Sequence, residues 1–167
     1  MTQEKKEQRK QYEKNYIKEH KNQIKQYQKN YRKDNAEKLH IMEVERHNRN
    51  KLNKSISVSI NKSLQGFKLG RHWENLLNYT LQQLKEHLES QFTPEMNWDN
   101  YGSYWEIDHI IPQNLFNITD ENCLDFKICW SLLNLRSLEK SLNRQRPKDG
   151  RDISEDVKQQ ILGQNII

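Results

Sequence analysis

A 15-residue repeat of basic and tyrosine side chains fills much of the first 40 residues and limits what this part of the chain can form. The stretch YEKNYIKEHKNQIK, from Tyr12, aligns with YQKNYRKDNAEKL, from Tyr27. The pairs in register are Tyr12/Tyr27, Lys14/Lys29, Asn15/Asn30, Tyr16/Tyr31, Lys18/Lys33 and Ile24/Leu39. Each copy has two Tyr four residues apart, on one helical face, and is rich in the helix formers Lys, Gln and Glu. The repeat therefore predicts a helical arm that carries no core of its own.

The positive charge of the chain is concentrated in this arm. Residues 1–54 hold 16 Lys/Arg and 8 Asp/Glu, a net of +8, whereas residues 55–167 hold 12 and 15, a net of −3. Such asymmetry indicates a nucleic acid or an anionic surface as the partner. The composition also fits an arm that is merely solvated or disordered. A membrane-surface helix would need the Leu, Phe and Trp that the tyrosine face lacks.

We expect the arm to bind double-stranded DNA, because Lys and Arg neutralise phosphates and Tyr hydroxyls add backbone contacts. The expected DNA-binding residues are Tyr12, Lys14, Tyr16, Lys18, Tyr27, Lys29, Tyr31, Arg32 and Lys33. Asp34, with Glu37 three residues later, resembles a helix N-cap. The helix is therefore expected to break and restart near Asp34.

The overall composition predicts a modest core in a cytoplasmic protein. Apolar residues make up 33% of the chain and charged residues 31%. No apolar run approaches the roughly 18 residues of a membrane span, and the N-terminal stretch lacks the apolar segment of a secretory signal. We therefore expect no membrane partner. Cys123 and Cys129 are too few for a disulfide scaffold or for a four-ligand zinc site.

The middle of the chain is expected to supply helical core. The stretch SISVSINKSLQG alternates like a strand, but Leu52, Ile56, Ile60 and Leu64 also recur every four residues, closed by Gly66. The helical pattern is the longer one, so a helix is expected. Further on, Thr80 and Gln83 form a capping box before Leu81, Leu84 and Leu88, which share one helical face.

The stretch YWEIDHIIPQNLF, residues 104–116, places an acid beside a histidine inside an apolar run. Buried runs rarely contain such a pair unless both groups are bonded or used. As a strand, the run would put Trp105 and His109 on one face and Asp108 on the other. Asp108 and His109 are therefore expected to serve different partners.

A second polar set follows in CWSLLNLRSLEKSLNRQRPKDG. A helix is expected from about Leu135, with Leu135, Leu138 and Leu142 as its apolar stripe and Asn143 at its end. Basic residues then follow at Arg144, Arg146 and Lys148.

These residue types form the minimal set for hydrolysis of a phosphodiester. His109 is expected to be the general base. Asp108 and Asn143 supply the carboxylate and amide oxygens that suit one Mg²⁺, with Mn²⁺ able to substitute. Asn134 can orient the imidazole, and Arg144, Arg146 and Lys148 can bind DNA phosphates.

The segments WEIDHIIP, WSLLNLRSL and NRQRPK resemble the HNH endonucleases of the small phage and mobile-element type. The segment YTLQQLKEHLESQFTPEMNWDNYGSYW, which precedes them, is also similar to that subgroup. The resemblance implies a ββα-metal unit of two antiparallel strands and a helix around one divalent ion. It also implies that Asp108 and Asn143 bind the metal, that His109 is the general base, and that Asn134 positions this base.

The chain departs from the family pattern at two points. Its last motif position is Asn143 instead of His, a variant that the family uses. The paired CxxC knuckles of many relatives are absent, and Cys123 and Cys129 have the wrong spacing to replace them, so no structural zinc is expected.

The sequence thus predicts an α+β, mostly helical chain. It comprises a basic helical arm over residues 1–50 and a nuclease domain over 51–167, in which a helical middle precedes a ββα-metal core at about 100–150. The expected activity is metal-dependent DNA cleavage, one strand per active site. A DNA-binding module with a vestigial site, and an RNA-binding or scaffolding protein, stay open as alternatives. The oligomeric state, monomer or homodimer, also stays open. So does the biological setting, which could be homing, restriction or phage genome processing in a bacterial host.

Overall fold

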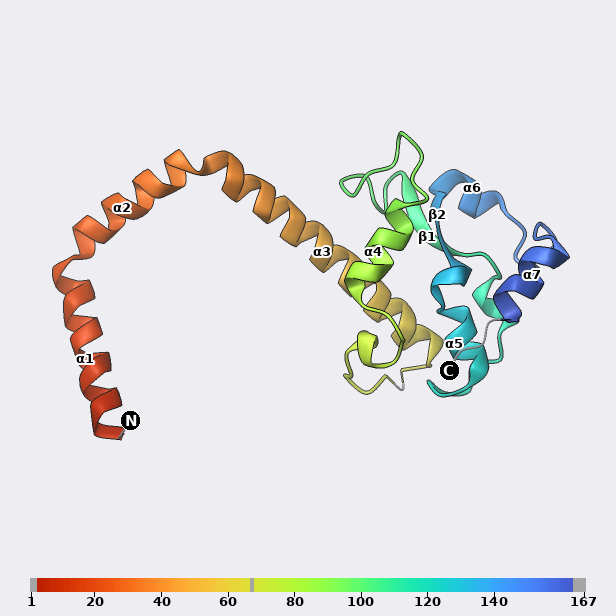
Figure 1. Ribbon diagram of the computed structural model, residues 1–167, viewed down its shortest axis with the longest axis horizontal. Helices are drawn as coiled ribbons and strands as arrows, with labels where there is room; N and C mark the ends of the chain where they lie inside the picture. The colour runs from red at the N-terminus through yellow and green to blue at the C-terminus, as the bar shows by residue number, and fades with distance from the viewer. Residues whose placement is uncertain (1–2, 67, 164–167) are drawn as a thin grey trace. The chain divides into compact units, whose positions relative to one another are not determined.

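The computed structural model describes residues 3–66 and 68–163. The chain divides into two compact units, Met1–His47 and Asn48–Ile167. The fold is mixed α and β and mostly helical, and the described residues form one sheet of two strands (Figure 1). None of the described helices is both long enough and apolar enough to cross a membrane. The mainly helical α+β class expected from the sequence is confirmed.

The arm consists of α1 (Gln3–Glu19), α2 (Lys21–Asp34) and the first part of α3 (Ala36–Ser63). The expected break after Asp34 is confirmed. The side chain of Asn35 donates to the carbonyl of Tyr31 at 2.9 Å. An earlier break, which no capping pattern in the sequence predicts, lies at His20, where ring atom Nδ1 bonds to the carbonyl of Tyr16 at 3.0 Å. The two breaks are 15 residues apart, so the sequence repeat is also a structural repeat.

The second part of α3 enters the core of the second unit. Leu52, Ile56 and Ile60 are all at most 2% exposed, and the whole stretch is helical, so the helix expected here is confirmed. The Nε1 of Trp73 donates to Asn53 at 2.5 Å and fixes the following turn to this helix. Because the apolar side of α3 is buried, its serine-bearing side is left to line a surface.

The remaining elements of the second unit follow in chain order. They are the 3₁₀ turn η1 (Trp73–Asn75), α4 (Leu81–Glu89), β1 (Trp105–His109), the 3₁₀ turn η2 (Gln113–Leu115), α5 (Leu124–Cys129), the 3₁₀ turn η3 (Leu132–Asn134), β2 (Leu135–Glu139), α6 (Lys140–Gln145) and α7 (Glu155–Leu162). The capping box of Thr80 and Gln83 is present at the start of α4. Leu84 and Leu88 of α4 are fully buried.

The two strands pair antiparallel, with Asp108 opposite Arg136 and His109 opposite Leu135. The helix expected from Leu135 is therefore wrong, because residues 135–139 form β2 and the helix begins at Lys140. Leu135 and Ser137 are buried while Arg136 turns to Asp108, a period of two that pairing with β1 selects over the leucine stripe. The short helix α6 then packs against both strands.

Candidate functional site

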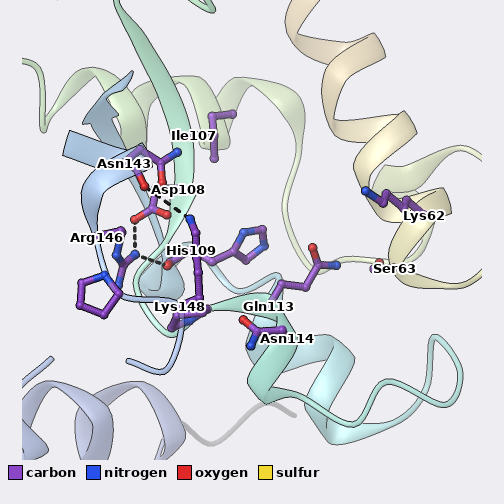
Figure 2. A pocket seen from close by; sticks show the side chains of 12 residues that line it. Lys62, Ser63, Ile107, Asp108, His109, Gln113, Asn114, Asn143, Arg146 and Lys148 are labelled. Carbon is purple, nitrogen blue, oxygen red and sulfur yellow. Dashed lines mark hydrogen bonds and ion pairs between the residues drawn. The ribbon is translucent and has the colours of Figure 1, made fainter. Parts of the chain in front are cut away.

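An open cavity of about 650 Å³ lies at the end of β1 (Figure 2). Asp108 and His109 of β1 line it together with Asn143 of α6. The loop after β1, the segment after α6, and Lys62 and Ser63 of α3 complete its walls. The structure thus brings three of the four motif residues expected from the sequence to one cavity.

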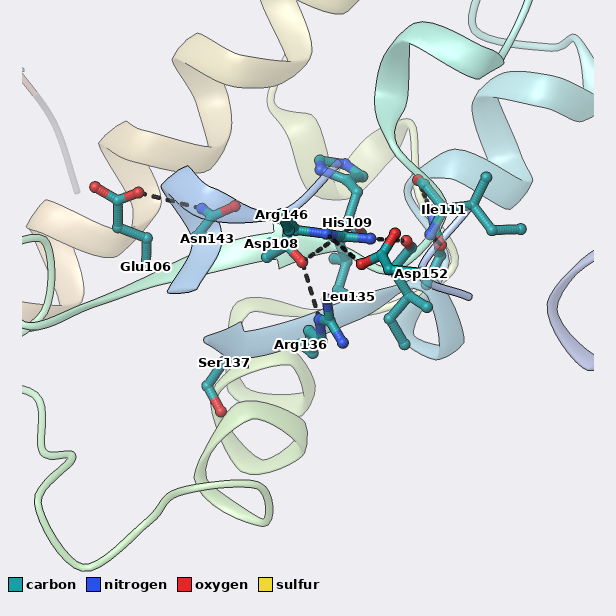
Figure 3. A network of polar contacts seen from close by, with 12 residues as sticks. Glu106, Asp108, His109, Ile111, Leu135, Arg136, Ser137, Asn143, Arg146 and Asp152 are labelled. Carbon is teal, nitrogen blue, oxygen red and sulfur yellow. Dashed lines mark hydrogen bonds and ion pairs between the residues drawn. The ribbon is translucent and has the colours of Figure 1, made fainter. Parts of the chain in front are cut away.

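The carboxylate of Asp108 is held by two guanidinium groups (Figure 3). Its Oδ2 accepts from Nε of Arg136 at 2.9 Å and also from Nη1 of Arg146. The Asp108 side chain is 10% exposed, so these bonds lie in a largely water-excluded place. A buried carboxylate needs such partners, and here both come from outside β1.

Arg146 is a clamp inside the site. Its side chain is 6% exposed, and besides Asp108 it donates to the carbonyls of His109 and Ile110, each at 2.7 Å, and to Asp152 at 3.1 Å. The sequence predicts that Arg146 binds DNA phosphates, but the structure directs its guanidinium inward. Nothing in the local sequence signals this role, because its carboxylate partners lie 38 residues before it and 6 after it.

His109 lies at the boundary between the cavity and the core. Its ring stands edge-on to Trp130, with centroids 4.7 Å apart and an interplanar angle of 85°. Burial lowers the pKa of His109 to about 4, with a further contribution from the positive charge of Arg146. Its Nε2 is enclosed and has no hydrogen-bond partner among the described residues. The imidazole is therefore neutral at neutral pH and has a lone pair to offer.

Asn134 is fully buried and holds the backbone that follows β1. Its Oδ1 accepts from the amide of Ile111 at 2.7 Å, and its Nδ2 donates to the carbonyls of Cys129 at 2.9 Å and Ile111 at 3.3 Å. No bond from Asn134 to the imidazole is found in residues 3–66 and 68–163. The structure thus places Asn134 behind the loop, so any effect on His109 passes through the backbone.

Asn143 is oriented by the carboxylate of Glu106, which is not among the site residues expected from the sequence. Its Nδ2 donates to Oε2 of Glu106 at 3.3 Å, and Glu106 also pairs with Lys140 at 3.3 Å (Figure 3). Glu106 and Asp108 share a strand face, and α6 packs against that strand. The alternation of β1 contains this signal, because it places Glu106 beside Asp108.

The oxygen donors of the cavity fit a divalent cation such as Mg²⁺ in type and number. Mg²⁺ is often held by one or two protein oxygens while it keeps several waters. Asp108 uses Oδ2 for both arginines, and within residues 3–66 and 68–163 its Oδ1 has no hydrogen-bond partner. The same part of the chain has no cluster of three or more His, Cys, Asp or Glu suited to a metal. Asp108 and Asn143 are thus the candidate pair of ligands.

The other expected DNA-binding residues lie outside the cavity, apart from Lys148, which lines it. Arg144 and Lys148 are exposed. In the arm, all the Lys, Arg and Tyr residues expected to contact DNA are exposed, with Tyr12 and Tyr27 at 70% and Tyr16 and Tyr31 at 47%. The matching exposures follow from the structural repeat. These side chains are therefore available to a partner.

Comparisons with known proteins identify relatives without a stated activity. No family model and no solved structure matches the chain. An uncharacterized protein of Acanthamoeba polyphaga mimivirus is 34% identical over 130 residues, which cover 74% of this chain and 56% of that protein. A second uncharacterized protein of the same virus is 42% identical over 55 residues, covering 33% and 23%. The chain thus spans little more than half the length of the first relative and under a quarter of the second.

Proposed function

We propose that the chain is a divalent-metal-dependent DNA endonuclease of the HNH type that hydrolyses one strand per active site. One observation carries the proposal: Asp108, His109 and Asn143 line the same cavity. The two antiparallel strands followed by a short helix that packs on both provide further support, because this is the order of elements in a ββα-metal unit.

His109 acts as the general base. A base needs a free lone pair at the working pH, and the lowered pKa of His109 keeps the ring neutral above about pH 5. The residue also lines the open cavity beside Asp108 and Asn143, where its neutral ring can take a proton from a water that enters the cavity. The bonds from Arg146 to the carbonyls of His109 and Ile110 fix the backbone of the base.

Asp108 and Asn143 would hold the metal ion. A bound Mg²⁺ supplies stabilisation of the charge on the 3′ leaving oxygen and on the phosphate. Arg136 and Arg146 hold Asp108 through its Oδ2 atom, which leaves Oδ1 for the metal. Glu106 accepts a hydrogen bond from the amide of Asn143 and so orients it. DNA is held by the exposed basic residues of the arm, together with Arg144 and Lys148.

A second candidate function is a DNA-binding module whose nuclease site is vestigial. The arginine pair on Asp108 favours it, because two guanidinium charges already neutralise this carboxylate and compete with a cation. Both candidates share the basic arm. They differ only in whether the cavity performs chemistry.

Nicking of supercoiled plasmid separates the two candidates. The full chain is incubated with Mg²⁺, Mn²⁺ or EDTA, and binding of the same DNA is measured in parallel by gel shift. The endonuclease predicts nicks with either metal and none in EDTA, with 3′-hydroxyl and 5′-phosphate ends. Binding without nicks in both metals would favour the vestigial module, and nicks that persist in EDTA would contradict both.

A further inference from the structure

A second cavity adjoins the first along α3. It has a volume of about 310 Å³, and Ile107 and His109 line both cavities. On the α3 wall, Ser55 and Ser59 line the second cavity and Lys62 lines the first. Residues spaced by four and three lie on one helical face, so this face of α3 contributes a wall to both cavities, which meet at Ile107 and His109 and are together called the groove.

The spacing of these residues explains the stretch SISVSINKS. Ile56 and Ile60 are buried, and Ser55 and Ser59, one residue before each, turn to the groove. The alternation in the sequence thus contains two helical stripes, one apolar and one hydroxyl-bearing, while Ser57 and Val58 line neither cavity. The small side chains of these serines fill little of the space beside β1, which leaves room for a chain of another molecule.

Two side chains of this wall are available to a ligand. Lys62 is exposed and its ammonium makes no ion pair or hydrogen bond among the described residues, and Figure 2 shows this amine directed toward the cavity from the wall opposite Asp108. Ser59 is exposed and likewise has no hydrogen-bond partner in the described part of the chain. By contrast, Lys51 donates to the carbonyl of Tyr101, and Ser55 accepts from the hydroxyl of Tyr101 at 2.9 Å.

The charge of the groove suits a polyanion. Its two carboxylates are already paired, Asp108 with two arginines and Glu106 with Lys140. The ammonium of Lys62 then adds an uncompensated positive charge to the α3 wall of the groove. From Lys51 to Lys62 the helix rises about 16 Å at 1.5 Å per residue, which matches about five nucleotides along one strand of a duplex at 3.4 Å each.

We propose that the groove between α3 and β1 is the track of the cleaved DNA strand, in which Lys62 and Ser59 bind the phosphates next to the one that faces His109. The inference rests on the proposed nuclease function and adds the substrate-binding wall. Because both groups contact phosphates, the track binds the strand without reading its sequence.

A charge-matched pair of variants tests the role of Lys62. Lys62→Gln is compared with Lys54→Gln, since Lys54 is an exposed residue of the same helix that is absent from both cavity walls. Both are made on full-length His109→Ala protein, and affinity for a short duplex is measured by fluorescence anisotropy over a range of salt concentrations. Lys62→Gln should weaken binding several-fold and lower the salt slope by about 0.9, with Lys54→Gln near the parent. Equal effects of the two variants would overturn the inference.

Cross-linking supplies a readout that does not depend on cleavage or on small changes in affinity. A photoreactive group is attached at Ser59→Cys or, as control, at Val58→Cys, which is 60% exposed and lines neither cavity. Both carry Cys123→Ser, because Cys123 is partly exposed. The track predicts cross-links to DNA from position 59 and few from position 58. The inference fails if position 58 reacts equally or if position 59 does not react while DNA is bound.

The two proposals fail in different ways. Cross-links from position 59 without nicking in metal would remove the nuclease function and leave the groove as a DNA-binding surface only. Nicking with equal effects of Lys62→Gln and Lys54→Gln would remove the track alone. A chain that binds no DNA would contradict both.

Discussion

Arg146, which lies 38 residues after Asp108, donates a hydrogen bond to its carboxylate from a side chain that is only 6% exposed. The same guanidinium group reaches the carbonyls of His109 and Ile110. The end of β1 is therefore fixed by one residue from the segment after α6. The site depends on this clamp for its shape as well as for its charge balance.

Replacing Arg146 with Ala should destabilise the second unit strongly. The change leaves Asp108 with Arg136 alone and removes the donor to two backbone carbonyls. Breaking a buried ion pair on one side typically costs about 3–5 kcal/mol. Urea denaturation of wild type, Arg146→Ala and Arg144→Ala measures the free energy of unfolding, with the exposed Arg144 expected to matter by less than about 0.5 kcal/mol. Equal losses in the two variants would show that Arg146 is not a clamp.

Replacing Asn134 with Ala should release the loop after β1. Its amide satisfies the backbone of Ile111 and Cys129, and each buried backbone group left without a partner costs about 1–3 kcal/mol. We expect a loss of about 3 kcal/mol or more and faster hydrogen exchange at the amide of Ile111. Asn143→Ala serves as control, because Asn143 is partly exposed and its side chain makes one hydrogen bond within the described part of the chain. Unchanged protection of the Ile111 amide would refute this role of Asn134.

His109 should make stability depend on pH in the acid range. Its pKa in the folded chain, about 4, is lower than the ordinary 6.5, so the unfolded chain binds more protons between these values. The free energy of unfolding should therefore rise from pH 4 to 6.5 and then level off. At about 1.4 kcal/mol per pH unit, the gain is at most about 3 kcal/mol. The measurement compares wild type with His109→Gln in EDTA, and parallel curves for the two proteins would contradict the expected contribution.

Removal of residues 1–34 should weaken DNA binding without unfolding the rest. The helices α1 and α2 contain no buried residues, so the free energy of unfolding should change by less than about 0.5 kcal/mol. The deletion takes away 11 Lys/Arg and 5 Asp/Glu, a net of +6, and should flatten the dependence of affinity on salt. Anisotropy titrations at several salt concentrations measure this slope. An unchanged slope would mean that the arm does not bind the phosphates.

The sequence predicts those elements whose pattern is local. The repeat, the capping box at Thr80 and the four-residue spacing from Leu52 to Leu64 each specify a helix from neighbouring residues, and all three helices are present. The strand β2 escaped prediction because its leucines also fit a helix, and only pairing with β1 decides between the two. Local pattern therefore determines most of the helices and the strand β1, which the alternation from Trp105 predicts, but not β2.

The candidate site likewise contains residues that the local sequence predicts and residues whose roles depend on partners distant in the sequence. Asp108 and His109 are conspicuous in sequence because an acid beside a histidine inside an apolar run needs partners. Arg146, a clamp instead of a phosphate contact, could not be recognised, because its partners are brought to it by the fold. The groove wall of α3 was hidden for the same reason, since its serines gain a meaning only once β1 lies beside them.

The most direct measurement for the central claim is the rate of plasmid nicking by His109→Ala in Mg²⁺, beside wild type and His40→Ala. His40 is an exposed histidine of the arm and controls for loss of a histidine as such. Loss of a general base predicts a rate about 10²–10⁴ times lower for His109→Ala, with DNA affinity unchanged and with partial rescue by added imidazole. His40→Ala should nick at the wild-type rate. If His109→Ala nicks as fast as wild type, His109 is not the base.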